Sequence, residues 1–181
     1  MLIICGPSCV GKTTFGRFAA SEGITAIEGS DSVKKLFAEQ KLDGEDVIDF
    51  CHRLYAAHGR DVFARATVSR MKAEGVDPNR TVFVGCRTVE EVEYLRGWSG
   101  GSIIGLHADT SIRFERCVAR DRPHKALRLE DFVKQDMREF EMGLARVLGS
   151  AIDRFLINEG SLLDLGALAQ IEIRNHIGKS K

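Results

Sequence analysis

Residues 6–13 read Gly6-Pro7-Ser8-Cys9-Val10-Gly11-Lys12-Thr13 and come directly after the apolar run Leu2-Ile3-Ile4-Cys5. This stretch matches the phosphate-loop pattern G-x-x-x-x-G-K-[ST] at every position, and a helix-compatible run over residues 14–20 follows it. The glycines allow the backbone to wrap around an anion, so that successive N–H groups and the positive end of the next helix face it. The alternative is a glycine-rich turn with a chance Lys-Thr pair. Because the flanking strand and helix fit the motif, the sequence predicts a nucleoside triphosphate site.

The motif also predicts which groups contact the triphosphate. Lys12 is expected to bridge the β- and γ-phosphates, and the Thr13 hydroxyl is expected to ligate Mg²⁺. ATP and Mg²⁺ are therefore the expected cofactors. The remaining residues expected at the nucleotide belong to the same loop and to the start of the following helix: Gly6, Ser8, Cys9, Val10, Gly11 and Thr14.

Composition indicates an ordinary globular protein. The chain has 181 residues, 44% of them hydrophobic and 29% charged, which suits one α/β domain over residues 1–181. Lys+Arg and Asp+Glu each count 26, so a bulk basic surface for nucleic acid is not indicated. The five cysteines are scattered without a C-x-x-C pair, which favours free thiols in a reducing compartment. With no signal peptide at Met1 and no apolar run near the ~20 residues that span a bilayer, we expect a cytoplasmic protein without membrane contact.

Five short apolar runs alternate with helical patterns along the chain. The predicted strands cover residues 2–5, 23–28, 81–85, 102–107 and 154–158. Such alternation favours an open, five-stranded parallel sheet with helices on both faces, the three-layer α/β sandwich of P-loop NTPases. Two or three helices are expected between the second and third strands, over about residues 30–77, which is longer than a simple crossover requires.

Several helix boundaries follow from capping signals and periodicity. Ser30 or Asp31 is expected to cap a helix that begins near Ser32. Thr88-x-x-Glu91 and Ser161-x-x-Asp164 predict two further helix starts. Apolar residues at 133, 137, 140, 144 and 147 repeat at helical spacing and predict one continuous amphipathic helix.

In a parallel sheet of this kind, ligands bind at the carboxyl ends of the strands, so the residues after each strand are candidates for the site. Glu28, Asp31 and Lys34 follow the second strand. Asp31 has two interpretations: it acts on Mg²⁺ or accepts a proton from a hydroxyl acceptor, or it only caps the helix. Arg87 follows the third strand and has the fork that binds an acceptor's phosphate, or else it is a surface arginine.

Further arginines lie away from the phosphate loop. Arg60 stands at a helix junction, where it either reaches the acceptor or pairs with its own helix. Beyond the fourth strand come four arginines, at positions 113, 116, 120 and 122. Guanidinium groups that stabilise a transferred phosphoryl group raise the rate on the order of 10³–10⁵-fold, and Arg116, Arg120 and Arg122 are candidates for this role. Arg120 and Arg122 flank a polar break and predict a short lid over about residues 120–128. Arg113 best fits a solvated basic helix face.

Taken together, six segments resemble the adenylate kinase-like group of small P-loop kinases, over residues 1 to about 166. The resemblance is nearest to archaeal-type dephospho-CoA kinase-like proteins and to phage deoxynucleotide monophosphate kinases. It is carried by GPSCVGKTT, IEGSDSVKK, HGRDVFARA, VFVGCRTVEEVEYLR, HADTSIRFERCVAR and FLINEGSL. The resemblance implies a nucleoside monophosphate kinase-like fold and an enzyme that moves the γ-phosphoryl group of ATP to a nucleotide-like acceptor, such as an NMP, a dNMP or dephospho-CoA.

The resemblance also implies roles for individual residues. Asp31 falls on the Asp of the T-G-D turn of adenylate kinases, and Lys34 falls on an acceptor-binding Arg. Arg87 falls on the Arg of their G-F-P-R turn. The turn that contains Asn158 and Gly160 would lie near the adenine, and residues 30–77 would bind the acceptor.

Two departures from that family pattern bear on activity. Val84 stands where the family usually has the Walker B Asp, so that Mg²⁺ would depend on Thr13 with Asp31 or Glu28. Lys34 lacks the bidentate fork of arginine, which weakens a strict monophosphate assignment. The alternative function is therefore a nucleotide-binding regulatory or partner protein, or a weak NTPase with an incomplete metal site. An NTPase acting on nucleic acid is disfavoured by the neutral charge. The acceptor, the donor triphosphate and the choice between monomer and homodimer stay open.

Overall fold

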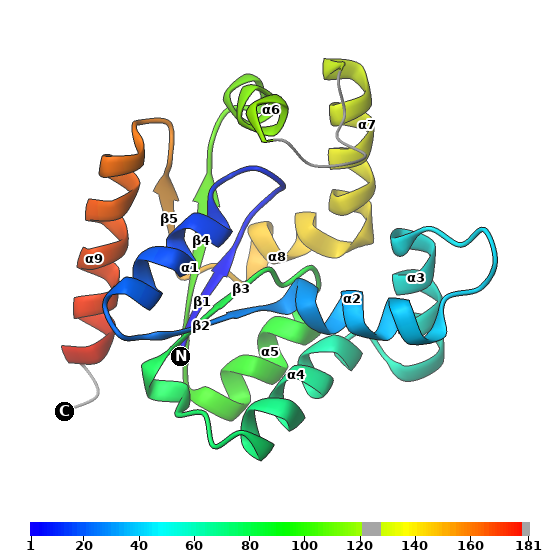
Figure 1. Cartoon of the computed structure of the whole chain (residues 1–181), viewed down its shortest axis with the longest axis horizontal. Coiled ribbons are helices and arrows are strands. Elements are labelled where there is room, and N and C mark those ends of the chain that lie inside the picture. The colour runs from blue at the N-terminus through cyan, green and yellow to red at the C-terminus, as the bar shows by residue number, and fades with distance from the viewer. Residues whose placement is uncertain (121–127, 179–181) are drawn as a thin grey trace.

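The sheet is built from five short strands whose apolar residues form the centre of the molecule. The computed structural model describes residues 1–120 and 128–178. The strands are β1 (Leu2–Cys5), β2 (Thr25–Glu28), β3 (Thr81–Val84), β4 (Ser102–His107) and β5 (Arg154–Ile157). All four pairings are parallel, in the order β2-β3-β1-β4-β5, which Figure 1 shows as a twisted layer between helices. The predicted five-stranded parallel sheet with helices on both faces is confirmed.

Two helices cover one face of the sheet. α1 (Lys12–Ser21) follows the phosphate loop, and α9 (Leu162–Gly178) packs beside it on the same side (Figure 1). Their apolar faces meet alternate residues of the central strands in one buried cluster, whose members include Leu2, Ile4, Phe15, Val82, Ile104, Leu165 and Ala169. Because side chains alternate across a strand, the residues between them point to the opposite face. α1 is therefore fixed against the sheet at the point where the loop ends.

The opposite face is covered by α4 (Val62–Ala73), α5 (Val89–Ser99) and α8 (Ala145–Ser150). The buried cluster on this side includes Ile3, Cys5, Val68, Met71, Phe83, Leu95, Ile103 and Leu144. α5 starts at the predicted capping box, in which the Thr88 side chain accepts from the Glu91 N–H and Glu91 bonds back to the Thr88 N–H. This arrangement confirms the helix start and fixes Arg87 immediately before it.

Three α-helices stand between β2 and β3, where the sequence predicted two or three. They are α2 (Gly29–Gln40), α3 (Val47–His58) and α4, and a 3-10 turn, η1 (Pro78–Arg80), precedes β3. Phe50, Leu54, Tyr55, Phe63 and Met142 form a small core of their own below α3. A buried 2.7 Å hydrogen bond between Ser32 and Thr67 joins α2 to α4. The inserted helices are therefore packed as a unit beside the sheet.

The predicted start of α2 is wrong. The helix begins at Gly29, directly after β2, and no side chain caps it. A Cβ at Gly29 would lie 2.9 Å from the Phe83 ring, so the strand turns into the helix where only glycine fits closely against β3. Asp31 lies in the first turn and pairs with Lys34 at 3.0 Å instead of capping the helix.

The helix predicted across residues 133–147 is broken. α6 (Thr110–Ala119) is followed by α7 (Leu129–Glu139), a π-helical segment, η2 (Phe140–Leu144), and α8. Gly143 has φ 137°, and a Cβ there would lie 2.8 Å from the Arg87 carbonyl oxygen. The break therefore occurs where the backbone passes close to the loop after β3. α6 and α7 stand beyond the carboxyl ends of the strands (Figure 1).

The buried face of α7 also differs from the prediction. Val133 and Met137 are 40% and 52% exposed, whereas Phe132, Asp136 and Glu139 are buried. These three residues follow one another at i, i+4 and i+7, so a polar row faces the protein interior. Within residues 1–120 and 128–178, no helix combines the length and apolar character that crossing a bilayer requires.

Candidate functional site

The phosphate loop is held open by two glycines and by the turn after β5. Gly6 and Gly11 have φ values of 150° and 105°, and a Cβ at either would clash, with the Leu106 carbonyl at 2.6 Å or the Asn158 amide at 2.5 Å. The Asn158 Nδ2 donates to the Val10 carbonyl at 2.8 Å. The loop therefore forms a cradle with the backbone geometry that an anion site needs.

Lys12 begins α1 and folds back over the loop. Its Nζ donates to the carbonyls of Gly6 and Pro7, each at 2.7 Å. Burial, and then the charge of Arg87, lower the pKa of the lysine to about 7, while Glu139 acts in the opposite direction. A bound phosphate would supply further negative charge beside Nζ and favour its protonated form. The ammonium is thus placed to bind an anion in the cradle.

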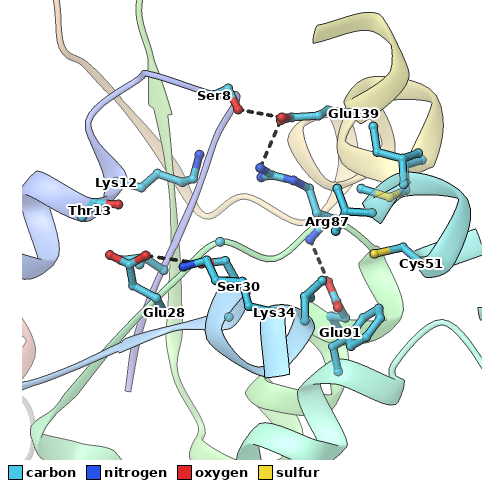
Figure 2. A pocket seen from close by; sticks show the side chains of 18 of the residues that line it. Ser8, Lys12, Thr13, Glu28, Ser30, Lys34, Cys51, Arg87, Glu91 and Glu139 are labelled. Atoms are coloured by element: carbon cyan, nitrogen blue, oxygen red, sulfur yellow. Dashed lines mark hydrogen bonds and ion pairs between the residues drawn. The ribbon is translucent and has the colours of Figure 1, made fainter. Parts of the chain in front are cut away.

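A first cavity of about 430 Å³ opens on the side of the loop that faces the inserted helices. Figure 2 shows Lys12, Thr13, Glu28, Lys34 and Arg87 around it. Ser8, Cys9 and Arg120 also line this cavity, so it contains eight of the residues predicted for the site. Much of the remaining wall is apolar and comes from the inserted helices and their surroundings: Val33, Val47, Ile48, Tyr55, Phe63 and Met142.

A second cavity, of about 280 Å³, lies on the other side of the loop. It is lined by predicted residues from the loop, α6 and the turn after β5: Cys9, Gly11, Thr14, Arg116, Arg120, Asn158 and Gly160. Cys9 and Arg120 line both cavities, so the two spaces meet at the phosphate loop. Burial, with the neighbouring Cys117 thiol, raises the pKa of Cys9 to about 11. The thiol is therefore protonated near neutral pH and serves as a small lining group.

Three of the described residues that were predicted to act in catalysis or on the acceptor do not line the first cavity. Arg116 donates to the carbonyls of Asn158 at 2.8 Å and Gly160 at 3.2 Å, so it holds the turn at the second cavity and does not line the first. Asp31 is half-exposed, pairs with Lys34 and lines neither cavity. Arg60 donates to the Met142 carbonyl and lies over the Tyr55 ring, outside both cavities.

Arg122 and most of the predicted lid, residues 121–127, lie outside the described residues. The lid therefore remains a prediction.

The sequence predicts that Thr13 holds Mg²⁺ together with Asp31 or Glu28, and of these two carboxylates only Glu28 lines the first cavity with Thr13. Val84 ends β3 directly opposite Glu28 in the register of β2 and β3, and it also lines this cavity. Figure 2 shows Glu28 and Thr13 on the same wall. Within the described residues, no group of three or more His, Cys, Asp or Glu side chains is arranged to hold a metal ion. Mg²⁺ commonly takes one or two protein ligands and completes its octahedron with water and phosphate oxygens. A Thr13 hydroxyl and a nearby Glu28 carboxylate fit that requirement.

The sequence interpretation missed Glu139 of α7. The Ser8 hydroxyl donates to its Oε1 at 2.6 Å, and the Arg87 guanidinium lies 3.0 Å from its Oε2 (Figure 2). Arg87 also donates to the Gly6 carbonyl at 3.3 Å. A buried carboxylate thus joins α7 to the phosphate loop. The row of Phe132, Asp136 and Glu139 at helical spacing was the available signal, because it places two acids on a face with an aromatic residue.

The interpretation of Arg113 is wrong. Its side chain is 3% exposed and makes paired hydrogen bonds to Asp136 at 2.9 and 2.6 Å. It also donates to the Ser8 carbonyl at 3.3 Å and lies over the Phe132 ring. A guanidinium survives burial here because a facing carboxylate neutralises it and satisfies its donors. α6 and α7 are therefore joined beneath the loop by a buried ion pair.

Glu91 lines the first cavity and has a raised pKa. Burial raises its pKa from the ordinary 4.5 to about 7, although the N–H groups of Arg87 and Thr88 bond to its Oε2 at 2.7 and 3.2 Å. Between these two pKa values the folded protein binds a proton that the unfolded chain has lost. Raising the pH through this window therefore lowers the free energy of unfolding.

This titration leads to a prediction for Glu91→Gln, in which glutamine can still complete the capping box. The wild type is expected to lose roughly 3 kcal/mol more stability than the variant as pH rises from 4.5 to 7. Urea unfolding at several pH values measures the difference. Glu93→Gln, at an exposed site on the same helix, should show the same dependence of the free energy of unfolding on pH as the wild type. If the free energy of unfolding depends on pH equally in wild type and Glu91→Gln, the raised pKa of Glu91 is contradicted.

The chain is similar to known proteins in both sequence and fold. The family described as AAA domain matches residues 2–138. A UPF0200 protein of Staphylothermus marinus is 30% identical over 168 residues, which cover 90% of this chain and 85% of the relative. Among solved structures, a gluconokinase from Sinorhizobium meliloti has a TM-score of 0.60 and 17% identity, covering 98% of this chain and 93% of that one.

A shikimate kinase from Bacteroides thetaiotaomicron has a TM-score of 0.59 and 13% identity, and the match covers 96% of this chain and 97% of the other. At such identities these two structures establish the fold, which is that of the P-loop kinases. The matches in sequence extend over most of the chain and establish more: the protein belongs to the AAA domain family and to the UPF0200 proteins.

Proposed function

We propose that this protein is an ATP-dependent phosphotransferase that moves the γ-phosphoryl group to a small-molecule acceptor. The observation that carries the proposal is that two cavities meet at one phosphate loop. A transferase needs a donor and an acceptor on opposite sides of the transferred group, held in line. Lys12 and Arg87 line the first cavity beside the loop, and their charges suit the phosphoryl group.

The donor occupies the loop and the second cavity in this proposal. The triphosphate lies along the N–H groups of the loop, with Lys12 at its β- and γ-phosphates and Thr13 and Glu28 at Mg²⁺. The base lies against the turn that Arg116 fixes through Asn158 and Gly160. ATP as donor is supported by the motif and by this space beside it.

The acceptor occupies the first cavity, whose volume of about 430 Å³ lies in the range usual for small-ligand sites. Apolar side chains from the inserted helices suit a compact organic body, and Arg87 and Lys34 suit a negatively charged group. Two structural neighbours are named as a gluconokinase and a shikimate kinase. The resemblance in sequence instead suggests a nucleotide-like acceptor, namely an NMP, a dNMP or dephospho-CoA. Arg120 lines both cavities and would stabilise charge on the transferred group.

An acceptor panel tests the proposal. ADP formation from ATP and Mg²⁺ is followed with NMPs, dNMPs, dephospho-CoA, gluconate and shikimate. We expect one acceptor class to raise ADP formation at least about tenfold above hydrolysis by water, because a positioned nucleophile reacts faster than solvent. The phosphorylated product is identified by mass spectrometry. If every acceptor leaves the rate at the level of water while ATP still binds, the transferase proposal fails, and the nucleotide-binding partner protein suggested by Val84 replaces it.

A further inference from the structure

The Glu139 carboxylate lines the first cavity beside the phosphate loop and lacks a complete set of hydrogen bonds. Its Oε1 accepts from Ser8 at 2.6 Å. Its Oε2 is buried and lies 3.0 Å from the Arg87 guanidinium, but within the described residues it accepts no aligned hydrogen bond. A buried carboxylate oxygen with unused acceptor capacity favours a ligand that donates a proton or a hydrogen bond.

The other carboxylates near the first cavity are committed elsewhere. Glu91 is held by the backbone N–H groups of Arg87 and Thr88 at the start of α5. Glu28 stands beside Thr13 at the place proposed for Mg²⁺. Asp31 pairs with Lys34 on the surface and does not line the cavity. Among the described carboxylates, Glu139 is therefore the one placed between the loop and the acceptor space.

The charges of the first cavity are unfavourable for an acceptor that reacts through a phosphate group. Lys12 and Arg120 lie beside the loop, where the triphosphate needs them. Arg87 is already paired with Glu139, and Lys34 is already paired with Asp31. A phosphate dianion in the first cavity beside the loop would face the Glu139 carboxylate, and like charges at short range repel strongly. A neutral hydroxyl group would find a proton acceptor there instead.

We propose that Glu139 is the catalytic base for phosphoryl transfer to a hydroxyl group of the acceptor. This inference rests on the proposed function and narrows its substrate class to acceptors that react through a hydroxyl group. The acceptor oxygen forms a bond to the γ-phosphorus as the bond from that phosphorus to the β–γ bridging oxygen breaks. ADP leaves with the electron pair, and the hydroxyl proton passes to Glu139, which later releases it to water.

The groups around Glu139 keep it ready for this step. Burial opposes its charge, but Arg87, the Ser8 hydroxyl, Lys12 and Arg113 together hold its pKa below the ordinary 4.5, so it is ionised in the free protein. When a triphosphate binds, new negative charge arrives beside it and its cationic neighbours turn to the phosphates. Both changes raise the pKa toward the working pH, where a general base is most effective.

The experiment compares Glu139→Gln with wild type. Glutamine keeps the shape and can still accept from Ser8, but it cannot take a proton at neutral pH. Glu141→Gln, an exposed site two residues further along, is the matched control. The hydroxyl probes are dephospho-CoA, gluconate and shikimate, and the phosphate probes are AMP, CMP and dAMP. Urea unfolding verifies that each variant is folded, and fluorescence titration measures its ATP affinity.

We expect kcat with a hydroxyl probe to fall on the order of 10²–10⁴-fold in Glu139→Gln, as for loss of a general base, with ATP affinity retained. The acid limb of the wild-type pH–rate profile should disappear in the variant, which a structural role for Glu139 would not cause. Glu141→Gln should resemble wild type in both respects.

Three outcomes would overturn the inference. An unchanged kcat for Glu139→Gln would show that Glu139 is not the catalytic base. A wild type that phosphorylates only AMP, CMP or dAMP would show that the acceptor does not react through a hydroxyl group. Either result leaves the phosphotransferase proposal intact. A wild type that binds ATP but phosphorylates neither class of probe overturns both proposals together, and is recognised by the absence of any phosphorylated product.

Discussion

Replacing Lys12 with methionine is expected to lower ATP-dependent turnover on the order of 10²–10³-fold, the usual loss when one preorganised charged donor is removed from a phosphoryl site. Methionine retains the length and apolar stem of the side chain but has no ammonium group. The Nζ now spans the Gly6 and Pro7 carbonyls, so its position above the loop is already set before a ligand arrives. Little reorganisation is needed for it to reach the phosphates.

Stability separates this effect from misfolding. Because burial lowers the pKa of Lys12 to about 7, the charged form is disfavoured in the folded state, and its removal should not destabilise the protein. Turnover and ATP affinity are measured for Lys12→Met and for Lys134→Met, which changes an exposed lysine on α7. Wild-type turnover in Lys12→Met would remove Lys12 from the reaction. A lower free energy of unfolding would contradict the account of its burial.

Replacing Arg113 with methionine is expected to destabilise the protein by about 3–5 kcal/mol, because Asp136 would be left as a buried charge without a partner. For a chain of this size, such a loss lowers Tm by roughly 6–20 °C. The pair is almost wholly enclosed between α6 and α7, so water does not screen it. Urea unfolding at neutral pH measures the change.

The double variant Arg113→Met with Asp136→Leu is the informative control. It removes both charges and leaves apolar side chains of similar size, so much of the lost stability should return. Arg138→Met, on the exposed side of α7, should change stability by no more than about 0.5 kcal/mol. If Arg113→Met is as stable as wild type, the ion pair contributes nothing to stability. If the double variant is no more stable than Arg113→Met, the loss of stability does not come from the unpaired Asp136 carboxylate.

The sheet and the loop could be predicted because their signals are local. Each strand is a short apolar run, and the loop is a motif whose glycines have a direct steric purpose at Gly6 and Gly11. The cap at Thr88 and Glu91 is local in the same way. These features depend on neighbours within a few residues, so the local sequence is enough to predict them.

α7 could not be predicted correctly, because its buried face depends on distant partners. Apolar periodicity favours Val133 and Met137 as the buried row of the helix. Asp136 and Glu139 are buried instead, because each forms an ion pair, with Arg113 and Arg87 respectively. The sequence of α7 gives no sign that Asp136 and Glu139 will pair with residues 23 and 52 positions earlier in the chain. The same limit hid Glu139, the residue on which the acceptor class now depends.

The contacts that brace the phosphate loop have a consequence for the order in which the protein forms. Residues 6–13 are synthesised before the residues that brace them, because Arg113, Glu139 and Asn158 contact the loop from far along the chain. Domains assemble as units once their distant pairings are available, and such pairings are slow. A nascent chain that ends before β5 carries the whole motif and lacks the Asn158 contact. We therefore expect nucleotide binding to require the chain as far as Asn158, and the motif by itself not to suffice.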